Sequence, residues 1–190
     1  MTPLLKTLLL LACLSSAHAL TSMTNVTEDW SFTCTDNQAL LLLESAFEEN
    51  PTLGEADDRV WNFTCGDVPA LLETPLTDCE WTFDVNDYTS YFEFQCYNDE
   101  IVTGVSSTYD VNSRDRKFRF QCCKPGNYVT HACQYSDFVN KAQEDLTYAV
   151  PDGFVLRGVS SLYVASGRDR LFKFDVCKLA LLFDPVVIIG

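Results

Sequence analysis

The chain has 190 residues, 47% of them hydrophobic, which is enough for one domain with a substantial core. Its 27 acidic and 13 basic residues give a formal net charge of −14. A chain this acidic is a poor candidate for binding nucleic acid, so we expect no nucleic-acid partner.

The first residues predict a signal peptide. Lys6 precedes an apolar run over 8–14, which is too short to span a bilayer, and Ala17-His18-Ala19 suits cleavage before Leu20. We therefore expect a signal peptide at 1–19 and a secreted protein without a membrane span. Cys13 leaves with that peptide, so eight of the nine cysteines remain, and four disulfides are expected in an oxidising compartment.

Two glycosylation sequons are usable in a secreted chain. They are Asn25-Val26-Thr27 and Asn62-Phe63-Thr64, whereas the proline at position 51 blocks a sequon at Asn50. Asn25 and Asn62 are the predicted glycosylation sites.

The sequence repeats itself, and the repeat carries most of the information. Segment 96–123 aligns without a gap with segment 150–177, and the two share Gly-Val-Ser-Ser and Arg-Asp-Arg at matching positions. A more diverged copy runs over 30–65. We expect one domain over 20–190 built from three modules, at about 28–66, 79–123 and 133–178.

Alternation along the closing segment of each module predicts strands with one buried face. The residues of that face share a pattern of arginine, two aromatics and a sulfur or aliphatic residue. They are Arg59, Trp61, Phe63 and Cys65, then Arg116, Phe118, Phe120 and Cys122, then Arg170, Phe172, Phe174 and Val176.

Asn62, Lys117, Arg119 and Lys173 then point outward. Segments 101–109 and 155–163 also favour strands, and 40–44 is either a strand or a helical turn, with strand favoured by analogy. The predicted fold is all-β, disulfide-stapled, with approximate threefold internal pseudo-symmetry in a prism-like or trefoil-like arrangement.

The repeat also predicts disulfide partners. Module three has Val150 and Val176 where module two has Cys96 and Cys122, and joint loss is what bonded partners would show. This pairs Cys96 with Cys122 and, by equivalence, Cys34 with Cys65.

Cys79 precedes Cys96 by the same spacing as Cys133 precedes Val150, which pairs Cys79 with Cys123 and Cys133 with Cys177. The alternative, Cys79–Cys122 with Cys96–Cys123, stays open because neighbouring cysteines can exchange roles.

The Asp-Arg-x-Trp/Phe-x-Phe pattern, used three times and ending in the adjacent Cys122 and Cys123 in module two, resembles the dermatopontin family. The resemblance spans the mature chain. It implies a small acidic protein of the extracellular matrix, found among collagen fibrils and dermatan-sulfate proteoglycans, or an agglutinin or cell-aggregation factor. Two departures are the absence of a cysteine after Cys177 and fewer tryptophans in the motif. Tyr88 lies among acidic residues, an environment that favours sulfation.

The repeated aspartate–arginine pairs have two interpretations. Recurrence once per module favours a structural role, with an Asp-initiated turn and a partly buried arginine stem over aromatics; the alternative is a binding role. The structural motif comprises Asp58, Arg59, Trp61, Asp115, Phe118, Asp169 and Phe172.

Basic residues concentrate on the matching strands of modules two and three. If those strands lie side by side, they form a cationic strip for sulfated glycosaminoglycan; the alternative is ordinary solvated charge. The residues of the predicted strip are Arg114, Arg116, Lys117, Arg119, Arg168, Arg170 and Lys173.

Catalysis has little support in the sequence. His131 is the only histidine outside the signal peptide, the cysteines are expected to be bonded, and no pair of carboxylates is marked out for glycoside hydrolysis. No Cys-x-x-Cys with matching histidines suggests zinc, so no enzyme activity, metal or cofactor is expected.

The expected function is matrix adhesion through sulfated glycosaminoglycans or proteoglycans, collagen or cell-surface glycans. A secreted defence agglutinin is the alternative. The apolar C-terminal stretch 186–189 is expected to form a terminal strand on the core.

Overall fold

A computed structural model describes residues 24–35, 37–49, 57–71 and 74–182. The predicted signal peptide and the C-terminal stretch 186–189 lie outside these residues. The described part consists of strands and one short 3-10 turn, and none of its helices is long and apolar enough to cross a membrane. The elements are β1 (Trp30–Thr33), β2 (Gln38–Glu48), β3 (Asp58–Asp67), η1 (Pro69–Leu71), β4 (Thr77–Trp81), β5 (Phe92–Gln95), β6 (Ile101–Asp110), β7 (Asp115–Lys124), β8 (Tyr128–Tyr135), β9 (Leu146–Ala149), β10 (Phe154–Val164) and β11 (Asp169–Leu181).

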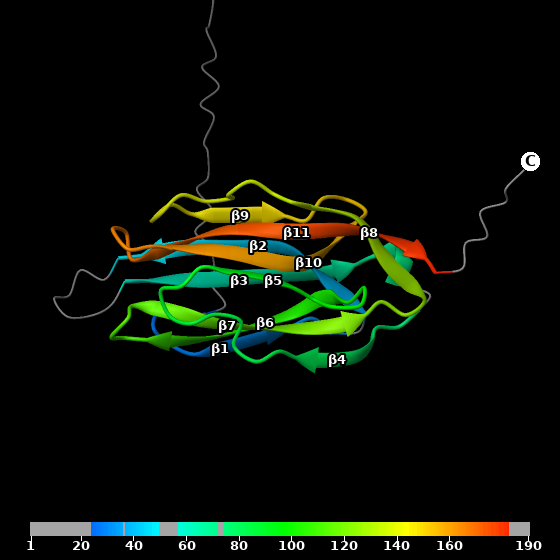
Figure 1. The fold of residues 1–190 in the computed structure, drawn as a ribbon, viewed down its shortest axis with the longest axis horizontal. Coiled ribbons are helices and arrows are strands. Elements are labelled where there is room, and N and C mark those ends of the chain that lie inside the picture. The colour runs from blue at the N-terminus through cyan, green and yellow to red at the C-terminus, as the bar shows by residue number, and fades with distance from the viewer. Residues whose placement is uncertain (1–23, 36, 50–56, 72–73, 183–190) are drawn as a thin grey trace, which may run out of the picture.

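The strands form three sheets that enclose a shared core and run along the long axis of the molecule (Figure 1). Their strand orders are β1-β6-β7-β4, β5-β10-β11-β8 and β3-β2-β9. Each sheet contains one long antiparallel hairpin, namely β2–β3, β6–β7 or β10–β11. The all-β prediction is confirmed, and segment 40–44 is strand rather than helix because it pairs with β3 on both sides of a bulge at position 41.

Every hairpin is extended by a short strand from another module. The module-one strand β1 pairs with β6 of module two, β5 of module two pairs with β10 of module three, and β9 of module three pairs with β2 of module one. The exchange is cyclic, so no module completes its sheet alone. The overall threefold pseudo-symmetry stays a prediction.

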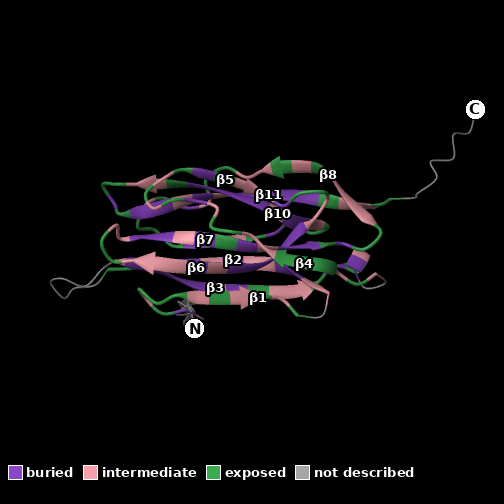
Figure 2. Cartoon of the chain, turned by 60° about the horizontal axis from the view of Figure 1, so that its bottom comes forward, coloured by how far each residue is buried: buried purple, intermediate pink, exposed green. Residues whose placement is uncertain are grey.

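The core is built from the predicted inward faces of the closing strands. The aromatic pairs Trp61/Phe63, Phe118/Phe120 and Phe172/Phe174 are all buried in one cluster. Between them along β7 and β11, Lys117, Arg119 and Lys173 are partly or fully exposed, as alternation requires. Figure 2 shows the same alternation of buried and more exposed residues along the strands.

Four disulfides fix the sheets. Cys34–Cys65 and Cys96–Cys122 each join two neighbouring sheets, because one partner follows a short exchanged strand and the other lies on a closing strand. Cys79–Cys123 ties β4 to β7, and Cys133–Cys177 ties β8 to β11. The pairs are those that the repeat favours over the alternative in which Cys122 and Cys123 exchange partners.

A single substitution tests this connectivity, because removing one cysteine frees its partner. We expect Cys96→Val to leave Cys122 as the free thiol and Cys79→Val, its control, to leave Cys123. Alkylation of the denatured, unreduced proteins followed by fragment mass spectrometry locates the modified residue. The reverse assignment in either variant would contradict the structure.

Candidate functional site

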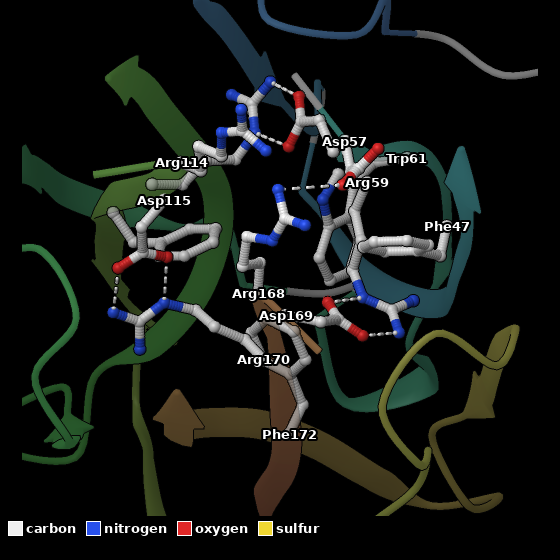
Figure 3. A pocket seen from close by; sticks show the side chains of 13 residues that line it. Phe47, Asp57, Arg59, Trp61, Arg114, Asp115, Arg168, Asp169, Arg170 and Phe172 are labelled. Atoms are coloured by element: carbon white, nitrogen blue, oxygen red, sulfur yellow. Dashed lines mark hydrogen bonds and ion pairs between the residues drawn. The ribbon is translucent and has the colours of Figure 1, made fainter. Parts of the chain in front are cut away.

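The three aspartate–arginine motifs meet in a closed cycle of ion pairs (Figure 3). Each aspartate binds the arginine of a different module. Arg170 Nε and Nη2 donate to the two oxygens of Asp115 at 2.7 and 2.6 Å. Arg59 binds Asp169 through two contacts of 2.7 Å, and Arg116 binds Asp58 in the same bidentate way. We call these six residues the ion-pair ring.

Further contacts satisfy the buried charges of the ring. The backbone N–H groups of Thr27, Thr89 and Gln143 each donate to one aspartate, at 2.6–2.8 Å. The three ring arginines in turn donate to the backbone carbonyl oxygens of Glu28, Ser90 and Glu144. Each of these residues directly follows one of the three N–H donors in the chain. Buried charges are tolerated only with such complete pairing. The ring is therefore a structural element of the fold.

Aromatic side chains cover the arginines from the outside. The guanidinium of Arg116 lies 5.2 Å from the ring centre of Tyr109, and that of Arg170 lies 5.7 Å from Tyr163. Arg59 lies 5.9 Å from the ring of Phe47. These distances suit cation–π attraction, which adds to the hydrogen bonds of the ring.

This complete pairing favours the structural interpretation of the motif, with a different geometry from the expected Asp-initiated turn. Asp58, Asp115 and Asp169 each begin a strand, and their carboxylates point across the module boundary. The assignment of Arg116 and Arg170 to a glycan-binding strip was wrong. Both are only 3% exposed and already hold a carboxylate, so they cannot reach an external anion.

A small pocket of about 30 Å³ lies beside the ring, where strands β3, β7 and β11 begin (Figure 3). Trp61, Phe118 and Phe172, the first aromatics of the three motifs, line it on the core side. The cavity holds roughly two waters, so a larger ligand would rest on its mouth rather than enter it.

Asp57, Arg114 and Arg168 line the same pocket, each immediately before the aspartate of its motif. Arg114 and Arg168 both have a positive φ, 49° and 48°, at the end of a hairpin turn. Arg168 Nη1 lies 3.6 Å from Asp57 Oδ2, with side-chain exposures of 48% and 19%. Unlike the ring arginines, Arg168 therefore remains accessible to a ligand.

The neighbouring tyrosines stay protonated. Burial, reinforced by the charge of Asp58, raises the pKa of Tyr109 to about 12. Burial also raises the pKa of Tyr163 above its usual value. Tyr109 donates its hydroxyl to the carbonyl oxygen of Asp57, and Tyr163 donates to that of Ser113, so both tyrosines brace the turns at the pocket.

The other predicted basic residues do not form a strip, because β7 and β11 belong to different sheets. Lys117 lies 3.5 Å from Asp84 and 3.4 Å from Asp87, with its ammonium over the ring of Tyr88. Arg119 donates to the carbonyl oxygen of Thr82. Of the residues predicted to bind glycans, the structure brings together Arg114 and Arg168 at an accessible surface.

Three polar side chains that anchor the motif were missed in the sequence. Asn86 accepts a hydrogen bond from the N–H of Phe118 and donates to the carbonyl of Arg116, and Asn140 does the same for Phe172 and Arg170. Thr24 accepts from the N–H of Trp61 in module one. The signal was present, since Val-Asn occurs at both 85–86 and 139–140.

The predicted glycosylation sites are in exposed or partly exposed positions. Asn25 is exposed, and Asn62 lies on the outward face of β3 with its side-chain amide donating to Glu44. Within the described residues, no group of three or more histidine, cysteine or acidic side chains is arranged to hold a metal ion.

A cyclic all-β fold, cross-linked by disulfides and closed by buried Arg–Asp pairs, defines a class of disulfide-bonded β protein. The sequence profile of the Dermatopontin family matches residues 21–181. The chain therefore belongs to the dermatopontin family.

Several characterised proteins are similar to it. A hemagglutinin/amebocyte aggregation factor of Limulus polyphemus is 36% identical over 65% of this chain and 70% of its own length. Dermatopontin of Mus musculus is 28% identical over 80% of this chain and 74% of its own, and that of Biomphalaria glabrata is 26% identical over 80% and 95%. No solved structure matches the chain.

Breaking the ion-pair ring should destabilise the protein strongly. Asp115→Ala leaves Arg170 as an uncompensated buried charge, and we expect the free energy of unfolding to fall by about 3–5 kcal/mol. Asp84→Ala is the control, because it removes an exposed partner of Lys117 and should cost less than about 1 kcal/mol. Urea unfolding with the disulfides intact measures both; equal losses would contradict the structural role of the ring.

Proposed function

We propose that this protein is a secreted adhesion component of the extracellular matrix that binds sulfated glycosaminoglycan chains or proteoglycans. The observation that carries the proposal is the position of Arg114 and Arg168, which the hairpin turns bring together at the mouth of one pocket. Membership of the dermatopontin family supports an extracellular adhesive or agglutinin-like role.

The electrostatics of the pocket favour an anion. Five arginines and four aspartates line it, whereas acidic residues outnumber basic ones about twofold in the whole chain. Six of these charges are neutralised in the ring, which leaves Arg114, Arg168 and Asp57 at the mouth. A sulfate resting there would receive charge-assisted hydrogen bonds from the arginines in competition with Asp57.

The rest of the proposal concerns architecture and partners. Residues 20–190 form one domain of three pseudo-symmetric modules after removal of the signal peptide at 1–19, with glycans on Asn25 and Asn62. The protein acts by binding rather than catalysis. Proteoglycans, collagen and cell-surface glycans are its proposed partners in the matrix.

Agglutination is the second candidate function. It is favoured by the relative from Limulus polyphemus, a hemagglutinin/amebocyte aggregation factor. An agglutinin must join two cells, so this candidate requires either two glycan sites on one chain or association of chains.

Retention on immobilised dermatan sulfate tests the first candidate. We expect the wild-type protein to elute at a salt concentration that Arg114→Ala/Arg168→Ala lowers clearly, with affinity weakened by about tenfold or more, because two charge-assisted contacts are lost. Arg119→Ala/Lys124→Ala is the control with the same change of net charge away from the pocket. Equal effects of the two double variants would contradict a defined site.

Agglutination of cells separates the two candidates. If matrix adhesion is the function, we expect the wild-type protein to cause no clumping of erythrocytes that free neutral sugars can inhibit. Sugar-inhibited clumping that survives Arg114→Ala/Arg168→Ala would establish the agglutinin instead. Light microscopy with serial dilution gives the readout.

A further inference from the structure

We propose that the outer face of the β5-β10-β11-β8 sheet carries a second site, which takes one neutral pyranose residue of a glycan. A cavity of about 200 Å³ lies on this face, lined by Tyr91, Glu93, Tyr135, Phe138, Ser160 and Lys173. It is separate from the arginine pocket and does not depend on the sulfated-glycan proposal. It would supply the neutral-sugar contact that an agglutinin needs.

The floor of the cavity is a row of three residues across neighbouring strands. Ser160 of β10 is in register with Glu93 of β5 on one side and with Lys173 of β11 on the other. Adjacent strands lie about 4.8 Å apart, so the backbones that carry Glu93 and Lys173 are roughly 10 Å apart. A single sugar ring fits between these two long side chains with its hydroxyls directed at both.

Aromatic surface walls the cavity. Phe138 is 44% exposed and Tyr91 is 56% exposed, which is unusual for large aromatic residues. Sites for small ligands combine such apolar surface with a few placed polar groups. The apolar C–H face of a pyranose can pack on Phe138 while the hydroxyls at its edge reach the polar floor.

The polar groups are held in place before any ligand arrives. Tyr91 donates its hydroxyl to Glu93 Oε2 at 2.8 Å, and Ser160 Oγ lies 3.2 Å from the same hydroxyl. Gln95 donates to the Tyr135 hydroxyl at 3.2 Å. Burial, together with the charge of Glu93, raises the pKa of Tyr135, which stays a neutral hydroxyl. Such preorganisation reduces the entropy lost on binding.

Lys173 is the group most evidently available to a ligand. Its ammonium lies 4.5 Å from the ring centre of Phe138. In the part of the chain that the structure describes, no side chain or carbonyl accepts a hydrogen bond or forms an ion pair with it, so its three donors can serve sugar oxygens. Glu93 offers the complementary acceptor, and its negative charge offsets the positive charge of Lys173, so the cavity has no net charge to attract a carboxylated or sulfated sugar and favours a neutral one.

The fold does not require this arrangement. The equivalent rows on the other two sheets are Ser31–Ser106–Arg119 and Thr147–Glu44–Asn62. The position of Phe138 corresponds to Asp84, since each precedes a valine whose N–H donates to the backbone carbonyl oxygen of the first aromatic residue of a closing strand. Among the described residues, the Glu–Ser–Lys row beside an exposed phenylalanine is thus particular to one sheet, as a binding site would be.

Ligand-observed saturation-transfer NMR with methyl glycosides of neutral hexoses and N-acetylhexosamines tests the proposal on the full secreted protein. We expect at least one of these sugars to bind in the millimolar range, and Phe138→Ala, Glu93→Gln and Lys173→Met each to weaken it by about tenfold or more. Phe83→Ala is the matched control, because Phe83 is an exposed aromatic in the equivalent loop outside the cavity.

The outcomes are distinct from those of the sulfated-glycan experiment. Arg114→Ala/Arg168→Ala should bind the neutral sugar normally, so loss of dermatan sulfate retention alone leaves this site intact. The proposal is overturned if no sugar of the panel binds the wild-type protein. It is also overturned if the three cavity variants, with circular dichroism and thermal unfolding like wild type, bind as well as Phe83→Ala does.

Discussion

Three buried Arg–Asp pairs that cross between modules are the interaction on which the structure depends. A buried pair contributes little net stability compared with an apolar replacement, but removing one partner is costly because the other is left uncompensated. Asp58 binds Arg116, Asp115 binds Arg170 and Asp169 binds Arg59, which fixes the neighbours of every module and closes the cycle.

The same ring determines what the hairpin end can do. It consumes the three arginines of the motif internally, so it withdraws Arg59, Arg116 and Arg170 from any ligand. It also fixes the starts of the closing strands, and thereby the turns that carry Arg114 and Arg168. The ion-pair ring thus positions a proposed binding site that is made of the residues directly before its aspartates.

The two proposed sites differ in chemistry and in place. One is a small cationic pocket where the closing strands begin. The other is a cavity on the outer face of one sheet, lined by aromatic residues, one lysine and one glutamate. Arg114 and Arg168 of the first site lie in hairpin turns, whereas Glu93, Ser160 and Lys173 of the second lie on paired strands, so less ordering is needed to bind at the second site. A rigid protein with two different glycan sites can join two chains of a matrix, and multivalent contact strengthens such weak sites.

The sequence by itself determined that the fold is all-β and which faces of the closing strands point inward, because alternation and internal repetition are local properties of the chain. The loss of both cysteines at the positions of Val150 and Val176, which match Cys96 and Cys122, also favoured one disulfide connectivity. Only the tertiary structure decided which strands are neighbours. The exchange of β1, β5 and β9 between modules placed β7 and β11 in separate sheets, dispersed the expected cationic strip and joined each aspartate to a distant arginine. Spacing along the chain cannot reveal such pairings, because they depend on how the modules close around a common core.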